Sequence, residues 1–342
     1  MPDSPPPSAS DQPPSAGWPP VLVAIRERAP RLVCYGDLVT DLVIAVERLP
    51  IEADRVQAIR AVQVEPGGAG NFLITAARLG AQALALGTIG NDYYGQQTFN
   101  ALAAEGVELR LVQRGEGTTN VLVLVIVDEA GRHVFLVREG EGPPLTLDAA
   151  TRNAIRQADA FFLPGYALQE QRVRHCALEA AQIAVAAGVP LISDLGPIVS
   201  EASVRLAAEA ITRLSTLSVL TADEAVRFTN ATDAAAAARA LQALGAQWVV
   251  LKRGPQGCTV YAPNGMTYVI NGLPVPVQDT TAAGDAFDAA LVAAWIACGD
   301  VARAAAFANC VGAAKVQKLG SGRQCPTLAE IAHTCATQGV VL

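Results

Sequence analysis

Histidine, paired cysteine and runs of basic residues are scarce in this sequence of 342 residues. The three histidines (His133, His175 and His333) show no spacing typical of a metal site or a catalytic triad. The seven cysteines form no C-x-x-C pair, so we predict small buried thiols in a reducing cytosol rather than a zinc site or a disulfide framework. Asp and Glu (32) outnumber Lys and Arg (25), which argues against a nucleic-acid partner.

Long apolar stretches are absent as well. No stretch approaches the roughly 20 uninterrupted apolar residues that a membrane-spanning helix needs, and the first residues lack the charged start and apolar core of a signal peptide. We therefore predict a cytoplasmic protein with no membrane partner. Hydrophobic residues still make up 51% of the chain, which is enough to bury the core of one large domain or of a large domain carrying a small one.

The sequence motifs of three common α/β enzyme classes are missing. No G-x-x-x-x-G-K-[ST] run and no G-x-S-x-G elbow occurs, which excludes P-loop nucleotide hydrolases and α/β-hydrolases. A nicotinamide dehydrogenase would carry G-x-G-x-x-G after its first strand, but the first strand here ends in G-D-L-V-T-D. The phosphate site of this protein must therefore be built differently.

The pattern along the chain predicts a tail followed by an α/β domain. Residues 1–20 hold eight prolines, a composition that favours a flexible tail, and we extend this tail to residue 30. Over residues 31–342, short β-branched runs alternate with Ala-rich helical stretches, which is typical of a mostly parallel sheet covered by helices. Each run ends at Gly, Pro or Asp, where open α/β sheets bind ligands.

Two strand-rich segments interrupt this alternation, at about residues 42–64 and 118–139. The second has a hairpin turn at residues 128–131. Neither segment can be a crossover helix. We predict that they form a small β-sheet standing off the main domain, which serves as a lid or as the surface of a homodimer.

The segment D-T-T-A-A-G-D-A-F at residues 279–287 is the most informative one. The small residues Ala282, Ala283 and Gly284 let backbone N–H groups at the start of a helix approach an anion closely. Asp285, just inside that helix, could accept a proton from a hydroxyl while the amides stabilise a transferring phosphoryl group. It could equally do no more than complement the helix dipole. The residue types alone leave both interpretations open.

Two further segments have polar or glycine-rich turns next to strands. Gly67, Gly68 and Asn71 precede or open a helix, where glycines permit close backbone approach and Asn can hydrogen-bond a hydroxyl. Asp41 follows the first strand, where a carboxylate can bind vicinal hydroxyls. Residues 252–257 (K-R-G-P-Q-G) form a turn that leaves room for a nucleotide over bare backbone.

Residues 279–287 are similar to the C-terminal motif of the ribokinase-like (PfkB-type) carbohydrate kinases, and the order of features from about Arg31 onward agrees with that family. The resemblance implies a three-layer α/β/α fold with a small β-sheet lid. It further implies that Asp285 is the catalytic base and that Ala282, Ala283 and Gly284 form the anion hole. By the same resemblance the substrate binds at five positions, namely Asp41, Gly67, Gly68, Asn71 and Arg138.

The resemblance also implies the cofactors. ATP would lie over Gly254 and Gly257, with Lys252 near the phosphates and Asn309 at the adenine pocket. Asp279 and Thr281 would support a monovalent cation such as K⁺.

Many members have Asn-x-x-Glu after the strand that matches residues 217–221, and the Glu organises the hydration of Mg²⁺. We align this motif with Asp223 and Val226, which leaves the Glu missing. Asp223 or Glu224 would then have to supply an oxygen to Mg²⁺.

The function that follows is an ATP- and Mg²⁺-dependent phosphotransferase acting on the hydroxymethyl group of a sugar or sugar-like molecule. Ribose, fructose, a keto-deoxy sugar acid and a nucleoside all remain open as substrates. The alternative, motivated by Val226, is an impaired family member that binds a sugar or nucleoside without turnover.

Overall fold

The computed structural model describes residues 19–142, 144–169, 171–196 and 202–339. Within these residues the β-branched runs form a nine-stranded sheet in the order β13-β12-β11-β10-β9-β8-β1-β4-β5. The strands from β11 to β5 are parallel, and only β12 and β13 run antiparallel to their neighbours. The strands are β1 (Arg31–Tyr35), β4 (Gln82–Ile89), β5 (Glu108–Arg114), β8 (Ala160–Pro164), β9 (Leu191–Asp194), β10 (Leu217–Thr221), β11 (Trp248–Lys252), β12 (Cys258–Tyr261) and β13 (Thr267–Ile270).

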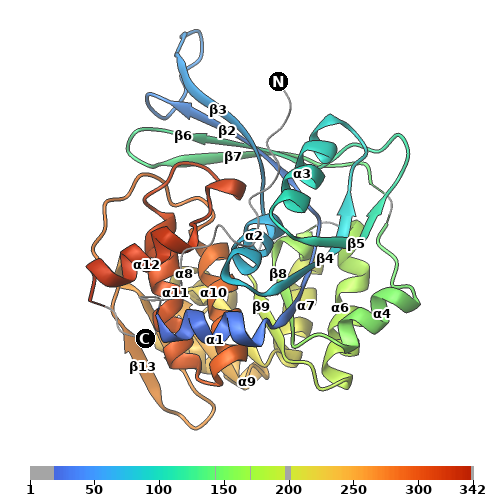
Figure 1. Cartoon of the computed structure of the whole chain (residues 1–342), viewed down its shortest axis with the longest axis vertical. Helices are drawn as coiled ribbons and strands as arrows, with labels where there is room; N and C mark the ends of the chain where they lie inside the picture. The colour runs from blue at the N-terminus through green and yellow to red at the C-terminus, as the bar shows by residue number, and fades with distance from the viewer. Residues whose placement is uncertain (1–18, 143, 170, 197–201, 340–342) are drawn as a thin grey trace.

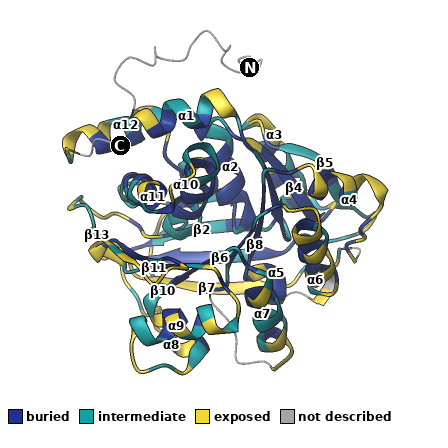
Figure 2. Ribbon diagram, turned by 90° about the horizontal axis from the view of Figure 1, so that it is seen from below, coloured by how far each residue is buried: buried dark blue, intermediate teal, exposed yellow. Residues whose placement is uncertain are grey.

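Helices cover both faces of this sheet, because its strands are apolar on both sides (Figure 2). One face packs on α1 (Pro20–Arg28), α2 (Ala69–Leu79), α10 (Ala283–Cys298), α11 (Val301–Lys315) and α12 (Leu328–Thr337), with α3 (Tyr93–Ala104) beside α2. The other packs on α4 (Ala149–Arg156), α5 (Tyr166–Gln169), α6 (Gln171–Ala186), α7 (Ala202–Leu214), α8 (Ala222–Thr229) and α9 (Ala234–Leu244). Two short 3₁₀ turns are η2 (Gly254–Gln256) and η3 (Gly322–Gln324). The predicted three-layer α/β/α fold is confirmed.

Helix α1 corrects the predicted tail, which was drawn too long at residue 30. Pro20 occupies the first helical turn, where its missing N–H is no loss. Val21, Leu22 and Ile25 are fully buried in the core that α1 shares with α10. Apolar side chains one and four positions apart on a helix face explain this docking. The remaining part of the predicted tail, residues 1–18, lies outside the described residues.

A second, smaller sheet projects from one end of the main body (Figure 1). Its strands are β2 (Thr40–Val46), β3 (Ile59–Pro66), β6 (Leu122–Val127) and β7 (His133–Arg138), in the order β3-β2-β6-β7. The two hairpins are antiparallel within themselves, and β2 and β6 join them in parallel. These strands fall within or beside the two segments that interrupt the alternation in sequence, and a turn at residues 128–131 connects β6 to β7 as expected.

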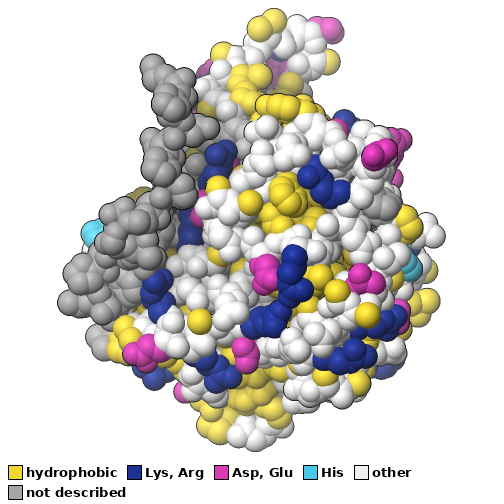
Figure 3. All heavy atoms as spheres, turned by 45° about the vertical axis from the view of Figure 1, so that its right-hand side comes forward, with side chains coloured by type: hydrophobic (Ala, Val, Ile, Leu, Met, Phe, Trp, Pro, Cys, Tyr) yellow, Lys and Arg dark blue, Asp and Glu magenta, His cyan; other side chains and the backbone are white. Residues whose placement is uncertain are grey.

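The surface and the thiols complete the description. In the view of Figure 3, acidic and basic side chains are interspersed rather than gathered into one charged area. All seven cysteines are free, and all but Cys298 are buried. Among the described residues, no helix is both long and apolar enough to cross a bilayer, and no cluster of three or more His, Cys, Asp or Glu side chains could hold a metal ion.

Candidate active site

A cavity of about 900 Å³ lies at the carboxyl ends of strands β9, β10 and β11. Parallel strands end at the same edge of the sheet, and the turns that follow them supply the lining. Asp194 ends β9, Thr221 ends β10, and Lys252 ends β11; all three line the cavity. The start of helix α10 lies opposite them and contributes residues 280–285. The geometry therefore brings the predicted anion hole to the edge where ligands bind in this class of fold.

Helix α10 begins at the cavity with its backbone donors free of side-chain caps. Ala282, the residue before its first turn, has a φ of 62°, in the left-handed region that small residues tolerate best. No side chain caps the N-terminus, so the first N–H groups remain available to an anion. Nine consecutive residues after Asp285, 286–294, are buried, which explains why this helix is apolar on every side.

Asp285 lies in the first turn of α10 and borders the cavity. Its Oδ2 accepts a hydrogen bond of 2.8 Å from Nδ2 of Asn71 in α2. Burial raises the pKa of Asp285 to about 6, although the bond from Asn71 and the charge of Lys252 act in the opposite direction. The carboxylate is thus more basic than an exposed Asp and still ionised at neutral pH. These are the properties that general-base catalysis requires.

Four of the predicted substrate residues lie close together beside Asp285, although none of them lines the cavity: Asp41, Gly67, Gly68 and Asn71. Asn71 bonds to two distant parts of the chain. Its Nδ2 donates to Asp285, and its Oδ1 accepts a hydrogen bond of 2.7 Å from the N–H of Gly322. Asp41 is buried at the start of β2, and burial together with the charges of Asp285 and Glu65 raises its pKa to about 7. A Cβ on Gly67 would lie 2.0 Å from Oδ1 of Asp41, so only glycine fits at this position. Gly68 has a φ of 50°.

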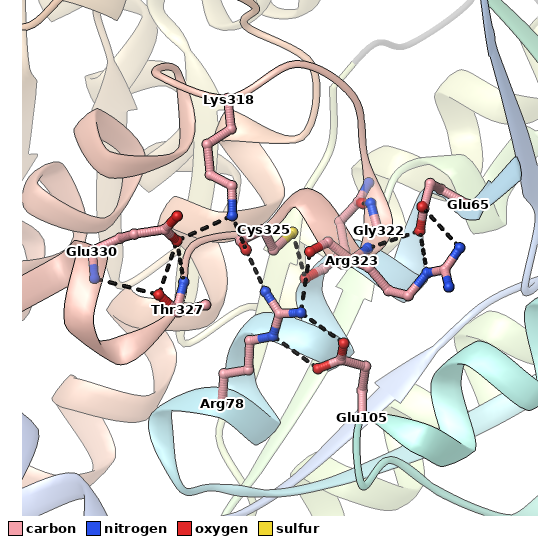
Figure 4. Close-up of polar contacts among 10 residues, drawn as sticks. Glu65, Arg78, Glu105, Lys318, Gly322, Arg323, Cys325, Thr327 and Glu330 are labelled. Carbon is pink, nitrogen blue, oxygen red and sulfur yellow. Dashed lines mark hydrogen bonds and ion pairs between the residues drawn. The ribbon is translucent and has the colours of Figure 1, made fainter. Parts of the chain in front are cut away.

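The segment after α11 closes this side of the site. Figure 4 shows Arg323 binding Glu65 on β3, with an Nε to Oε2 distance of 2.9 Å. In the same view Arg78 binds Glu105 and the carbonyl of Cys325, which fastens η3 against α2. Ser321 in this segment is fully buried, and its hydroxyl lies beside Asp41, where it acts to lower the pKa of that carboxyl.

Lys252 makes contacts that the sequence did not predict. Its Nζ lies 2.6 Å from Oδ2 of Asp194 and 3.2 Å from Oδ1 of Asp288. Burial acts to lower the pKa of Lys252, but these two carboxylates outweigh it and raise the pKa above the usual value. Asp194 and Asp288 come from β9 and α10, far apart in sequence. The one local signal for Asp288 was its position three residues after Asp285, on the same face of a helix.

The predicted ATP residues Gly254, Gly257 and Asn309 also line the cavity. Gly257 has a φ of 86°, and a Cβ there would approach the carbonyl oxygen of Ile270 to 2.2 Å. The bare backbone of this turn is therefore a steric requirement. Asn309 on α11 donates through Nδ2 to the carbonyl oxygen of Asn271 at 3.3 Å.

The alignment of the Asn-x-x-Glu motif needs correction. Asp223 is exposed and does not line the cavity, and Val226 packs against the core under α8. Thr221 and Glu224 both line the cavity and have the spacing of the motif, with Thr in place of Asn. They form a capping box in which the N–H of Thr221 donates to Oε2 of Glu224 at 2.9 Å. Of the two acidic residues expected to supply an oxygen to Mg²⁺, Glu224 lines the cavity and Asp223 does not.

Arg138 does not reach this cavity, contrary to its predicted role. Its guanidinium donates to the carbonyl of Asn120 at 3.0 Å and lies 3.4 Å from Oδ2 of Asp92. Asp92 in turn caps α3, because its side chain accepts a hydrogen bond from the N–H of Gly95. Arg138 thus holds the end of β7 against α3 rather than lining the site.

Asp279 and Thr281, the predicted cation residues, are buried beside the start of α10. Oδ1 of Asp279 accepts bonds from both the N–H and the hydroxyl of Thr281, at 2.9 and 2.7 Å. Oδ2 accepts the N–H of Gly320 at 2.8 Å. The carboxylate therefore connects the turn before α10 to the segment after α11.

Together the fold and the site define an α/β enzyme that places a basic carboxylate at a helix N-terminus above a ligand cavity. The family model described as "pfkB family carbohydrate kinase" matches residues 29–328. The chain therefore belongs to the pfkB family of carbohydrate kinases. An ATP-dependent ribose-1-phosphate kinase of Halopiger xanaduensis is 30% identical over 308 residues, which cover 88% of this chain and 97% of that relative. A ribokinase of Bacillus subtilis is 27% identical over 303 residues, covering 88% and 98%.

Solved structures agree on the fold. A putative ribokinase from Agrobacterium tumefaciens superposes with a TM-score of 0.79 at 22% identity and covers 90% of this chain and 98% of its own. A ribokinase of Arabidopsis thaliana, solved with ribose and ATP, has a TM-score of 0.76 at 22% identity with the same coverage. At these identities the similarity establishes the architecture alone.

Proposed function

We propose that this carbohydrate kinase transfers the γ-phosphoryl group of ATP to a hydroxymethyl group of a sugar, with Asp285 as the general base. One observation carries the proposal. The Asp285 carboxylate lies between Asn71 of the predicted sugar loop and the cavity bordered by Gly254 and Gly257. Family membership supports the same reaction, and a relative described as ATP-dependent supports ATP as the donor.

In this mechanism Asp285 removes the proton of the sugar hydroxyl. The hydroxyl oxygen forms a bond to the γ-phosphorus while the bond from that phosphorus to the bridging oxygen of ADP breaks. The N–H groups at the start of α10 would stabilise the charge on the transferring group, because residues 282–285 line the cavity and no side chain caps this end of the helix. One of them, the N–H of Ala283, already donates to the carbonyl oxygen of Thr280 at 3.2 Å. Lys252, held by Asp194 and Asp288, adds a fixed positive charge at the same end of the cavity.

Glu224 is the residue that would hold Mg²⁺. Its carboxylate packs over Gly196, where a Cβ would come within 2.4 Å, so the backbone leaves room for it to face the cavity. Carboxylate oxygens and water are the ligands that Mg²⁺ prefers. When bound, the ion would neutralise charge on the ATP phosphates. A solved neighbour from Escherichia coli, titled as a putative ribokinase II in complex with ATP and Mg²⁺, supports this cofactor pair.

The sugar site favours a neutral substrate such as ribose or fructose. Asp41 and Asp285 are two neighbouring carboxylates: burial raises the pKa of both, and the charge of Asp285 raises the pKa of Asp41 further. A phosphate or carboxylate on the substrate would meet this negative charge, and Arg138, its predicted partner, is bound to Asp92. The buried hydroxyl of Ser321 beside Asp41 suits a sugar hydroxyl. Relatives described as ribokinase and probable fructokinase agree with this preference.

The experiment is an ADP-release screen with ATP and Mg²⁺ across pentoses, hexoses, sugar acids, nucleosides and ribose 1-phosphate. Turnover of a neutral pentose or hexose, abolished in Asp285→Asn, is the expected result. Turnover of ribose 1-phosphate alone would overturn the substrate assignment while leaving the kinase assignment intact. Binding of sugars without ADP release by the wild type would favour the alternative, an impaired family member that binds a sugar or nucleoside without turnover.

We further propose that the small sheet pairs with its copy in a homodimer. Strand β7 is the edge of this sheet, and all six of its residues are exposed. Val134 and Leu136 are among them, at 42% and 51% exposure. Exposed apolar side chains on an unpaired edge are a typical dimer surface.

A further inference from the structure

Lys315, the last residue of α11, is a fully buried lysine. Its Nζ donates a hydrogen bond of 3.0 Å to the carbonyl oxygen of Lys318. Among the described residues no carboxylate lies close enough to form an ion pair with it. Burying an ammonium group without a direct ionic partner is costly. Such a lysine in an otherwise Ala-rich helix therefore requires an explanation.

The surroundings of Lys315 are the turn that precedes the anion hole. The N–H groups of Gln278 and Asp279 both donate to the carbonyl oxygen of Val316, at 2.8 and 3.2 Å. Gly320 donates to Asp279, and Asp279 binds Thr281. The backbone that follows Lys315 is thus bonded to the turn that contains the buried Asp279 carboxylate. Asp279 and Thr281, the residues expected to support a monovalent cation, both lie in this turn.

The buried Asp279 carboxylate and the buried Lys315 ammonium group carry opposite charges. Asp279 is completely buried, and the groups that hydrogen-bond it are neutral. Burial lowers the pKa of Lys315, whereas the negative charges of Asp279 and Asp285 favour its protonated form. Of the charges around Lys315, Asp279 favours its protonated form most, so the ammonium group is a fixed positive charge that acts on the buried Asp279 carboxylate.

We propose that the Lys315 ammonium takes the place of the monovalent cation, so that this kinase needs no K⁺. The carbonyl of Lys318, a ligand of the type K⁺ uses, is already engaged by Nζ of Lys315. A metal cation added beside Asp279 would be repelled by the buried ammonium. The inference rests on the proposed role of the α10 N-terminus as the anion hole, whose turn Lys315 then helps to fix as a positioning residue.

The test compares K⁺ with tetramethylammonium at equal ionic strength. The wild type should have the same kcat, within about 2-fold, in the two salts. Lys315→Met keeps the apolar stem but removes the charge, and its kcat should fall by about 10-fold or more, since fixed charges at such sites are worth at least that. Added K⁺ or Rb⁺ should restore most of this loss. Lys318→Met is the matched control, because Lys318 in the same segment points to Glu330 and the carbonyl of Cys325 instead (Figure 4).

A second measurement does not depend on activity. The Tm of the ligand-free wild type should be the same in both salts, whereas that of Lys315→Met should rise with K⁺ concentration, because a new cation site stabilises the folded state. If Lys315→Met does not fold, Lys315→Gln replaces it. A wild type whose kcat or Tm rises specifically with K⁺ would overturn the inference, and so would a folded variant that K⁺ leaves unchanged. Failure of every sugar in the ADP-release screen would count against the proposed function alone.

Discussion

At the scale of single residues, the site depends on two carboxylates that are more basic than usual. Asp285 has a pKa of about 6 and Asp41 of about 7, and burial is the main cause in both. Raised values in the folded state favour the neutral acid, so the folded protein loses stability as the pH rises from about 4 through these values. For Asp285 the loss is at most about 3 kcal/mol, at 1.36 kcal/mol for each pKa unit. The burial that makes these carboxylates more basic therefore also lowers the stability of the folded protein at neutral pH.

The first prediction concerns the pH dependence of turnover. Because the base must be deprotonated, kcat/KM should fall as the pH drops through about 6 and should level off above it. Asn71→Leu removes a hydrogen bond that lowers the pKa of Asp285, so the acidic limb should move to higher pH. Steady-state kinetics from pH 5 to 9 measure both profiles. An acidic limb that stays in place in Asn71→Leu would contradict the assignment of Asp285 to that limb.

The second prediction concerns Gly67. The Cβ of Gly67→Ala would overlap the Asp41 carboxylate and displace it from the pocket. We expect the KM for the sugar to rise at least about 10-fold, the range for losing a charged hydrogen-bond partner, while the KM for ATP stays the same. Steady-state titration of each substrate separates the two effects. Equal increases in both KM values would mean that Asp41 does not bind the sugar.

At the scale of helices and strands, the features that were predicted correctly are those that a local sequence pattern encodes. The alternation of strands and helices, the hairpin at residues 128–131 and the helix that follows Gly67 and Gly68 were all predicted from periodicity and turn residues. Helix α1 was missed because prolines surround it, although Val21, Leu22 and Ile25 form an apolar face. The sequence left Asp223 and Glu224 as equal candidates for Mg²⁺, because only the structure shows that Glu224 lines the cavity and that Asp223 does not.

Pairings between distant elements could not be predicted. Lys252 meets Asp194 and Asp288 only because three parts of the chain converge at one sheet edge. Arg138 was expected in the pocket, and whether it turned to a substrate or to Asp92 depended on where α3 docks. No local pattern carries that information.

The third prediction tests the docking of α1. Leu22→Ala should lower the free energy of unfolding by about 2 to 5 kcal/mol, because a fully buried leucine leaves a cavity when it is truncated. Chemical denaturation of the whole chain measures it. Glu27→Ala, on the exposed face of the same helix, is the control and should change stability by less than about 0.5 kcal/mol. Similar small effects for both would show that α1 is not part of the core.

At the scale of the whole molecule, the two sheets contribute different parts of the proposed site. The large sheet positions the proposed anion hole and the proposed nucleotide side, and the small sheet contains Asp41 at its junction with the main body. His133 and Phe135 of β7 border the main cavity, so movement of the small sheet would open or close it. A dimer through β7 would couple assembly to the shape of the site.

The fourth prediction tests this dimer. Leu136→Asp should convert the wild-type dimer to a monomer, because it places a charge in the apolar edge. Light scattering after size exclusion gives the mass of each. Val269→Asp alters a similarly exposed valine on β13, the edge of the large sheet, and should leave the dimer intact. A wild type that is monomeric at tens of micromolar would refute the proposal.

The measurement that tests the central claim most directly is the kcat of Asp285→Asn on the sugar that the wild type phosphorylates, at pH 8, with the Tm of both proteins measured alongside. The account predicts a fall of about 10²-fold to 10⁴-fold, the contribution of a general base. It also predicts an equal or higher Tm, because a buried charge has been removed. A folded variant that keeps kcat within about 10-fold of the wild type would contradict the claim that Asp285 is the base.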